Sequence, residues 1–228
     1  MTAPQTVIDL RNMFGEVRDQ GPRPTCMAFA ASDTHAALRG GWLPLSCEYI
    51  FFKAQKRASR LPTVGALLPA TLAALHDDGQ PSEAGWPYLA ATPADPATWV
   101  PPKEVGPLYG RDGSTAKHVL DHIIANLEQG TPVIILTKLS ASFYLPGPNA
   151  IVVPAADELP DANIRHAVIA MGHGIANGEP ALLVRNSWGP GWGDNGYGWL
   201  PESFLISRLY GAATLKENVD VSASSVAA

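Results

Sequence analysis

The hydrophobic and polar positions divide the chain into a helical first half and a β-rich second half. Apolar residues recur at helical spacing in three stretches of the first half, residues 26–39, 46–56 and 67–76. A Gly-Gly pair follows the first stretch and is typical of a helix end, and the second begins with a serine, which is typical of an N-cap. Residues 81–107 contain seven prolines and are expected to form a long irregular connection.

The second half is expected to contain one helix and several short strands. The helix covers residues 117–129, and Ser114 is available as its cap. Runs of apolar and β-branched residues predict four strands, at residues 132–139, 166–171, 181–185 and 196–200. A helical segment followed by a β-rich segment favours an α+β fold of two lobes, with the functional cleft between them.

The proline-rich connection sets the expected domain organisation. We predict a single domain over residues 1–228, in which residues 11–110 form the helical lobe and residues 111–215 form the β lobe. Residues 216–228 end in small and polar side chains and are expected to be a flexible tail.

The composition excludes several classes of protein. Charged residues make up 16% of the chain and apolar residues 46%, which argues against intrinsic disorder. The formal charge is −5, so there is no basic excess with which to bind nucleic acid. No apolar run is long enough to span a membrane, and residues 1–10 lack the pattern of a secretory signal. We therefore expect a cytoplasmic protein with no nucleic-acid or membrane partner.

The two cysteines have different surroundings in the sequence. Two thiols are too few for a disulfide framework and fit a reducing compartment. Cys26 begins an expected helix, whose unpaired N–H groups favour a thiolate, and the upstream Gln20 offers an amide that can stabilise an oxyanion. Cys47 lacks such a loop and precedes an apolar run, so we interpret it as a small buried side chain. The predicted nucleophile is Cys26.

A thiol nucleophile needs a base, and the base needs an orienting group. His166 begins one expected strand, and Asn186 directly follows the next one. Neighbouring strands can bring the two side chains together, so that the Asn oxygen accepts a hydrogen bond from the imidazole and fixes its tautomer. The spacing of His166 and Asn186 in the sequence is by itself weak evidence for such a pair.

Four local motifs together resemble the papain-like cysteine peptidases (C1-type). They are Gln-Gly at 20–21, Cys-Met-Ala-Phe-Ala at 26–30, Arg-His-Ala-Val at 165–168 and Asn-Ser-Trp-Gly-Pro-Gly-Trp-Gly at 186–193. The resemblance covers nearly the whole chain, and the order Cys, His, Asn matches the family. It implies a papain-like two-lobe fold, with a helical N-terminal lobe, an antiparallel β-barrel-like C-terminal lobe and an active-site cleft between them.

The resemblance also implies a role for individual residues. Carried over by motif, Cys26 is the nucleophile, His166 the general base and acid, Asn186 the orienting residue and Gln20 the oxyanion donor. Four further residues are implied in substrate binding, with Trp188 also covering the His–Asn hydrogen bond: Gly65, Leu67, Ala167 and Trp188.

Several positions depart from the pattern of the family. Met27 replaces the usual tryptophan after the nucleophile, and Arg23 replaces a cysteine that normally forms a disulfide. Arg165 precedes the histidine, and a neighbouring cation lowers the pKa of an imidazole. Met1 lies near the usual start of the mature domain, so the resemblance is to a bacterial-like cytosolic member without a propeptide.

His118 and His122 stand at i and i+4, a spacing that can hold a metal ion. Neither a glutamate beside the first histidine nor a third ligand is present, so a solvated helix face is the better interpretation. No metal and no cofactor are expected.

Three functions remain open from the sequence. The first is a thiol protease, a hydrolase that cleaves a peptide or protein substrate through a thioester. The second is acyl transfer to an amine by the same residues, and the third is a peptide-binding relative with impaired turnover, suggested by Met27 and Arg165. A regulatory or inhibitor protein is a further expected partner.

Overall fold

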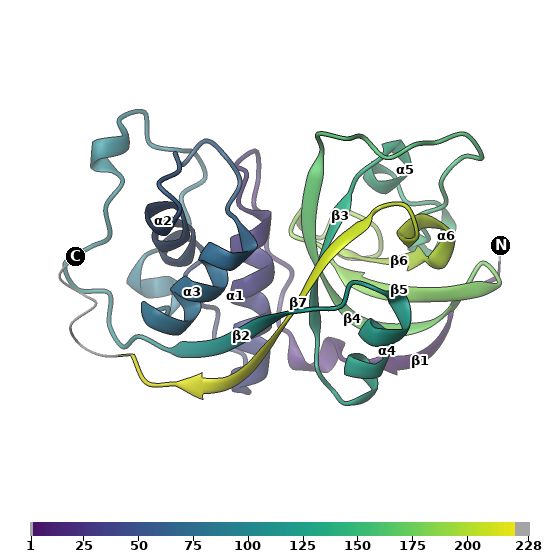
Figure 1. The fold of residues 1–228 in the computed structure, drawn as a ribbon, viewed down its shortest axis with the longest axis horizontal. Coiled ribbons are helices and arrows are strands. Elements are labelled where there is room, and N and C mark those ends of the chain that lie inside the picture. Colours follow the sequence, from purple (N-terminus) through teal and green to yellow (C-terminus); the bar gives the residue numbers. More distant parts are fainter. Residues whose placement is uncertain (1, 222–228) are drawn as a thin grey trace. The chain divides into compact units, whose positions relative to one another are not determined.

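The structure is a computed structural model that describes residues 2–221, and the chain divides into two compact units. Unit 1 contains Met1–Asp19 and Thr115–Thr214, and unit 2 contains Gln20–Ser114 and Leu215–Ala228. The units divide at residues 19/20, 114/115 and 214/215, whereas the expected lobes were residues 11–110 and 111–215. The first 19 residues belong to the β-rich unit 1. The helices and strands of both units are labelled in Figure 1.

Unit 2 is built on three α-helices, α1 (Cys26–Arg39), α2 (Cys47–Arg57) and α3 (Leu68–Asp77), which contact one another. Small alanine side chains let the buried face of α1 approach its neighbours closely. Gly40 ends α1 with φ 73°, and the Ser46 side chain accepts a hydrogen bond from the Tyr49 N–H at the start of α2. The three expected helices and their end signals are therefore confirmed.

The proline-rich connection is mostly irregular, as expected. It holds the short 3₁₀ turns η2 (Glu83–Gly85) and η3 (Pro96–Thr98). Trp86 and Trp99 from this segment are buried and pack edge-on against Phe52 of α2. The connection is therefore part of the core of unit 2.

Seven strands form one sheet with the order β2-β7-β3-β4-β5-β6, and β1 also pairs with β4. Their bounds are β1 (Gln5–Asp9), β2 (Gly110–Ala116), β3 (Val133–Lys138), β4 (Arg165–Ala176), β5 (Glu179–Arg185), β6 (Tyr197–Pro201) and β7 (Leu209–Val219). β4 is antiparallel to β1, β3 and β5. The sheet ends at β2 and β6, so it is open where a barrel-like sheet was expected.

Short helices complete unit 1: the 3₁₀ turns η1 (Arg11–Met13) and η4 (Pro148–Ala150), and the helices α4 (Leu120–Glu128), α5 (Ala141–Tyr144) and α6 (Glu202–Leu205). α4 lies beside the sheet (Figure 1) and contacts β3 and β4. Its buried side chains belong to one apolar core with those of the central strands. The β3 segment is buried almost along its whole length, which explains its continuous apolar run.

The sequence analysis misplaced several elements. Ser114 lies inside β2 and does not cap α4, which begins three residues later than expected and has Val119 at its N-cap. Strands β1, β2 and β7 were not expected. β1 is mostly exposed and β2 contains two glycines, so neither carries an apolar run, and pairing with the neighbouring strands makes each of them a strand.

The expected flexible tail is corrected in its first part. Residues 216–219 belong to β7, because the buried Arg111 guanidinium donates to the Lys216 carbonyl and to the Asn218 side chain. Residues 222–228 lie outside the described residues. No helix within residues 2–221 is long and apolar enough to cross a membrane.

Close approach of β1 to β4 requires glycine at two positions of β4, Gly172 and Gly174. A Cβ atom on Gly174 would lie 2.1 Å from the Gln5 carbonyl oxygen, whereas one on Gly191 would meet nothing within 4 Å. We predict that Gly174→Ala lowers the free energy of unfolding by about 2 kcal/mol, because β1 must move away from β4. Chemical denaturation measures the effect, with Gly191→Ala as the control. Equal stability of the two variants would contradict the β1–β4 pairing.

Candidate active site

His166 and Asn186 are held together by the pairing of β4 with β5. The register places Ile169 opposite Arg185, so Asn186, the next residue, lies beside the start of β4. The His166 Nε2 atom lies 2.7 Å from Asn186 Oδ1, and the Ser187 N–H donates to the same oxygen at 2.8 Å. An amide oxygen only accepts, so Nε2 carries the proton and Nδ1 is left as the proton acceptor.

Aromatic side chains surround this pair. The Trp188 ring lies 4.7 Å from the His166 ring, between centroids, and Tyr144 stacks on Trp188 at 5.3 Å. Phe143 contacts both the histidine and Trp188 edge-on. The rings exclude water, which strengthens the His166–Asn186 hydrogen bond. Sequence reasoning found Trp188 and missed Phe143 and Tyr144, which carry no motif that marks them.

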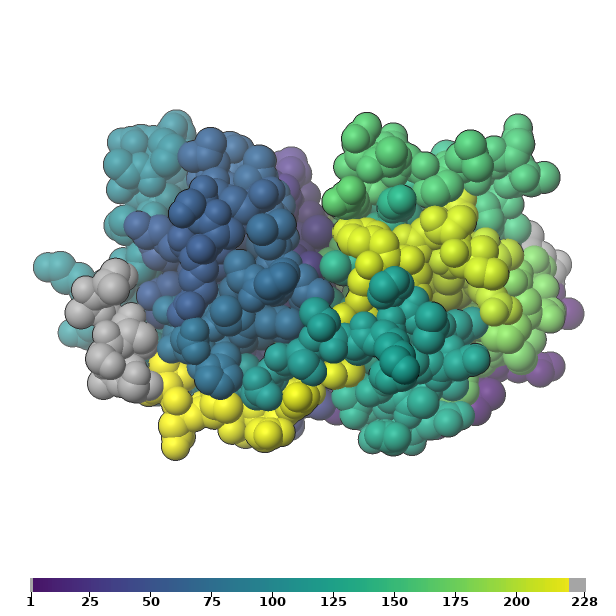
Figure 2. Space-filling view, in the orientation of Figure 1, coloured from purple at the N-terminus to yellow at the C-terminus, as the bar shows by residue number. Residues whose placement is uncertain are grey.

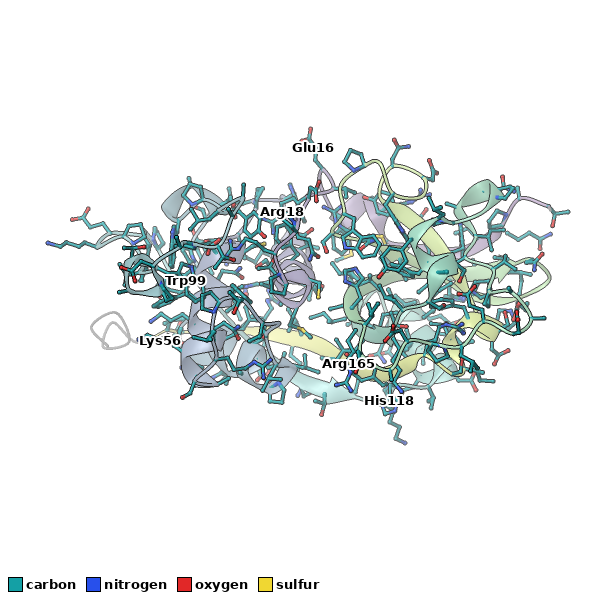
Figure 3. All side chains as sticks on the ribbon, turned by 90° about the horizontal axis from the view of Figure 1, so that it is seen from above. Glu16, Arg18, Lys56, Trp99, His118 and Arg165 are labelled. Atoms are coloured by element: carbon teal, nitrogen blue, oxygen red, sulfur yellow. The ribbon has the colours of Figure 1, made fainter. Side chains whose placement is uncertain are left out.

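Burial lowers the pKa of His166 to about 4, and the hydrogen bond with Asn186 opposes this effect. The imidazole is therefore neutral near pH 7 and can accept a proton. Arg165 lies exposed at the surface (Figure 3), and its guanidinium is 5.5 Å from the centre of the Tyr210 ring. Consecutive strand residues face opposite sides of a sheet, so Arg165 and His166 lie on opposite faces. The expected lowering of the pKa is present, and its cause is burial; Arg165 is not among the causes.

Cys26 is the first residue of α1 in unit 2, where the helix dipole favours a thiolate. Its side chain is half-buried, whereas Cys47 is fully buried, and neither is in a disulfide. The expected interpretation of Cys47 as a buried small residue agrees with this position. Reactivity at a thiol needs access, so Cys26 is the better nucleophile of the two.

The segment before Cys26, residues 20–25, is called the nucleophile loop below. The Gln20 side chain is buried, and its Nε2 atom donates to the Arg23 carbonyl at 2.8 Å. The same carbonyl accepts from the Thr25 N–H at 2.9 Å. The Arg23 backbone carbonyl therefore holds the side chain of Gln20, the predicted oxyanion donor, within the loop that leads to Cys26.

The predicted substrate-binding residues are divided between the units. In unit 2, Gly65 lies where a Cβ atom would be 3.8 Å from the Pro24 carbonyl, and Leu67 is 46% exposed at the N-cap of α3. In unit 1, Ala167 is buried beside His166 on β4. The structure thus groups His166, Asn186, Ala167 and Trp188 in unit 1, and Cys26, Gln20, Gly65 and Leu67 in unit 2.

Two of the hollows formed by the described residues lie on unit 1. One, of about 710 Å³, is lined in part by Tyr144 and Trp192 and borders the aromatic cover of His166. The other, of about 270 Å³, lies between α4 and α6, which adjoin in teal and yellow in Figure 2. His118 lines the second hollow at the surface (Figure 3), and residues 2–221 hold no group of three or more His, Cys, Asp or Glu side chains suited to a metal ion.

Comparison with known sequences decides the family. The sequence model described as papain family cysteine protease matches residues 65–204, which is more than half of the chain. The chain belongs to the papain family. The matched residues include His166 and Asn186, whereas Cys26 lies before them.

Individual members of the papain family match over shorter segments. A cysteine protease of Blomia tropicalis is 33% identical over 98 residues, which are 42% of this chain and 29% of that protein. Pro-cathepsin H of Bos taurus is 36% identical over 77 residues, 34% of this chain and 21% of that protein. These matches span less than a third of each relative.

Solved structures of the papain family share the fold over most of the chain. Xylellain, a cysteine protease from Xylella fastidiosa, has a TM-score of 0.75 at 24% identity, covering 94% of this chain and 87% of that one. Procathepsin L 3 of Tenebrio molitor has a TM-score of 0.71 at 19% identity, covering 95% and 71%. The α+β, papain-like fold class predicted from the sequence is confirmed.

The lowered pKa of His166 makes stability depend on pH. An unfolded histidine binds a proton below about pH 6.5, whereas folded His166 binds one only near pH 4. Its contribution to stability is therefore complete above pH 6.5 and is lost as the pH falls toward 4, by about 1.4 kcal/mol for each unit. We predict that the free energy of unfolding falls more steeply over this range in the wild type than in His166→Gln. Parallel pH profiles of the two proteins would show that His166 is not buried as a neutral imidazole.

Proposed function

We propose that the protein is a cysteine endopeptidase that cleaves peptide bonds through Cys26, His166 and Asn186. The observation that carries the proposal is the 2.7 Å contact of His166 Nε2 with Asn186 Oδ1, which leaves Nδ1 as a proton acceptor. A half-buried thiol at the start of α1 supplies the matching nucleophile. Membership of the papain family supports this combination of residues.

The reaction begins with transfer of the Cys26 proton to His166 Nδ1 and attack of the sulfur on the peptide carbonyl carbon. The Cys26 N–H and the Gln20 amide donate to the oxyanion that forms. His166 then gives the proton to the leaving amine, the C–N bond breaks, and a thioester remains on Cys26. Water, deprotonated by His166, attacks the thioester and releases the carboxylic acid and the thiol. The two units must bring Cys26 Sγ within hydrogen-bond reach of His166 Nδ1 for the first step.

A peptide or protein is the proposed substrate. Gly65 has no side chain and would let the substrate backbone approach closely, while the 46% exposed Leu67 would offer an apolar surface for a side chain next to the scissile residue. We therefore propose a preference for apolar side chains there. A regulatory or inhibitor protein and a cytoplasmic location remain predictions, the latter from the cysteine content.

Active-site labelling tests the nucleophile. We predict that a peptidyl vinyl sulfone labels the wild type and Cys47→Ala but not Cys26→Ala, because only Cys26 combines access with a helix N-terminus. With a peptide substrate, Cys26→Ala lowers kcat by more than about 1000-fold. Intact-mass spectrometry and peptide cleavage measure both effects. Labelling that survives in Cys26→Ala and disappears in Cys47→Ala would reverse the assignment.

Product analysis of the peptide-cleavage reaction separates hydrolysis from acyl transfer and from loss of turnover. In the presence of an added primary amine, we expect mass spectrometry to show the carboxylic acid as the main product. Mostly amide product would identify an acyl transferase that uses the same residues. A wild type whose thiols react no faster than glutathione at pH 7 would identify a peptide-binding relative that has lost turnover.

A further inference from the structure

A buried ion pair joins the nucleophile loop to α2 in unit 2. The Arg23 guanidinium binds the Glu48 carboxylate with both terminal nitrogens, at 2.5 and 2.9 Å. Arg23 is 3% exposed and Glu48 is 0% exposed. Burying two charges is unfavourable unless they are paired and fully hydrogen-bonded, so this pair needs further partners.

Those partners come from the proline-rich connection. The Glu48 carboxylate also accepts from the Leu89 N–H at 3.0 Å and from the Trp99 indole N–H at 2.6 Å (Trp99 is labelled in Figure 3). Arg23 donates in turn to the Leu89 carbonyl at 2.7 Å. The pair therefore ties the nucleophile loop to α2 and to residues 89–99 by five directed hydrogen bonds.

Tyr88 holds the same loop at both ends. Its hydroxyl donates to the Gln20 carbonyl at 2.7 Å and lies 2.8 Å from the Thr25 hydroxyl. The Arg23 guanidinium lies 5.0 Å from the centroid of the Tyr88 ring, and Phe29 of α1 packs edge-on against that ring at 4.8 Å. The loop is thus fixed relative to the helix that begins with Cys26.

We propose that Arg23 and Glu48 are positioning residues for the oxyanion donor Gln20, an inference that rests on the proposed function. The Arg23 side chain is anchored by Glu48, and the Arg23 carbonyl orients the Gln20 amide at 2.8 Å. An oxyanion donor works only when it lies within a few tenths of an ångström of its required place. Displacing Arg23 therefore moves Gln20 without touching substrate.

A double-mutant cycle isolates this action through Gln20. We predict that Gln20→Ala lowers kcat about 100-fold and that Arg23→Met lowers it about 10-fold or more, with KM changed less than about 3-fold. In the double variant, kcat stays close to that of Gln20→Ala, because a donor that is absent cannot be misplaced. Arg23→Lys, which keeps the charge, recovers part of the loss.

Arg111→Met is the matched control. Arg111 is a buried arginine of the same unit, 4% exposed, and it donates to Leu38, Lys216 and Asn218. We expect it to lower the unfolding temperature with little change in kcat at a temperature where the protein is folded. If Arg23→Met does not fold, Glu48→Gln takes its place, because it removes the charge and keeps the shape of the side chain.

The outcomes are distinguishable. Activity that persists in Cys26→Ala overturns the proposed function itself. Cys26-dependent activity in which the Gln20→Ala and Arg23→Met effects multiply overturns the positioning role alone, as does a kcat of Arg23→Met equal to that of Arg111→Met. Alkylation of Cys26 by iodoacetamide, which forms no oxyanion, is expected to change less than about 3-fold in Arg23→Met, and a parallel fall with kcat would also overturn the role.

Discussion

The antiparallel pairing of β4 with its neighbours is the constraint on which unit 1 depends. β3 and β1 pair with successive parts of one edge of β4, and β5 pairs with the other edge. Val168 and Ala170 of β4 belong to the apolar core of unit 1. Its register with β5 brings Asn186 to His166. Since a shift of one residue would turn every side chain to the opposite face, the buried apolar face of β4 also fixes the orientation of the imidazole.

In unit 2, a short loop carries the proposed oxyanion donor Gln20 and precedes the proposed nucleophile Cys26, and neither cysteine of the chain is in a disulfide. The buried Arg23–Glu48 pair connects this loop to α2, and the cost of burying the Glu48 carboxylate is offset by hydrogen bonds from Leu89 and Trp99. The two units thus hold the proposed catalytic groups by different means: strand register and aromatic cover in unit 1, and a buried, hydrogen-bonded ion pair in unit 2.

Much of this could be predicted from local patterns. The three helices of unit 2, the four apolar strands and the pairing of His166 with Asn186 follow from periodicity, caps and short motifs. Strands β1 and β2 could not be predicted, since their sequences have no apolar alternation and their hydrogen-bond partners lie far away in the chain. Phe143 and Tyr144 were missed for the same reason, because only the fold places them on Trp188.

The sequence by itself determined the family resemblance, the candidate catalytic residues and the α+β class, because these depend on residue types within short motifs. Only the tertiary structure decided the protonation of His166 and the anchoring of the nucleophile loop. The pKa of the imidazole depends on burial, and the partners of Arg23 come from residues 25 to 66 positions away. Both effects arise from desolvation and long-range contact, which no local pattern encodes.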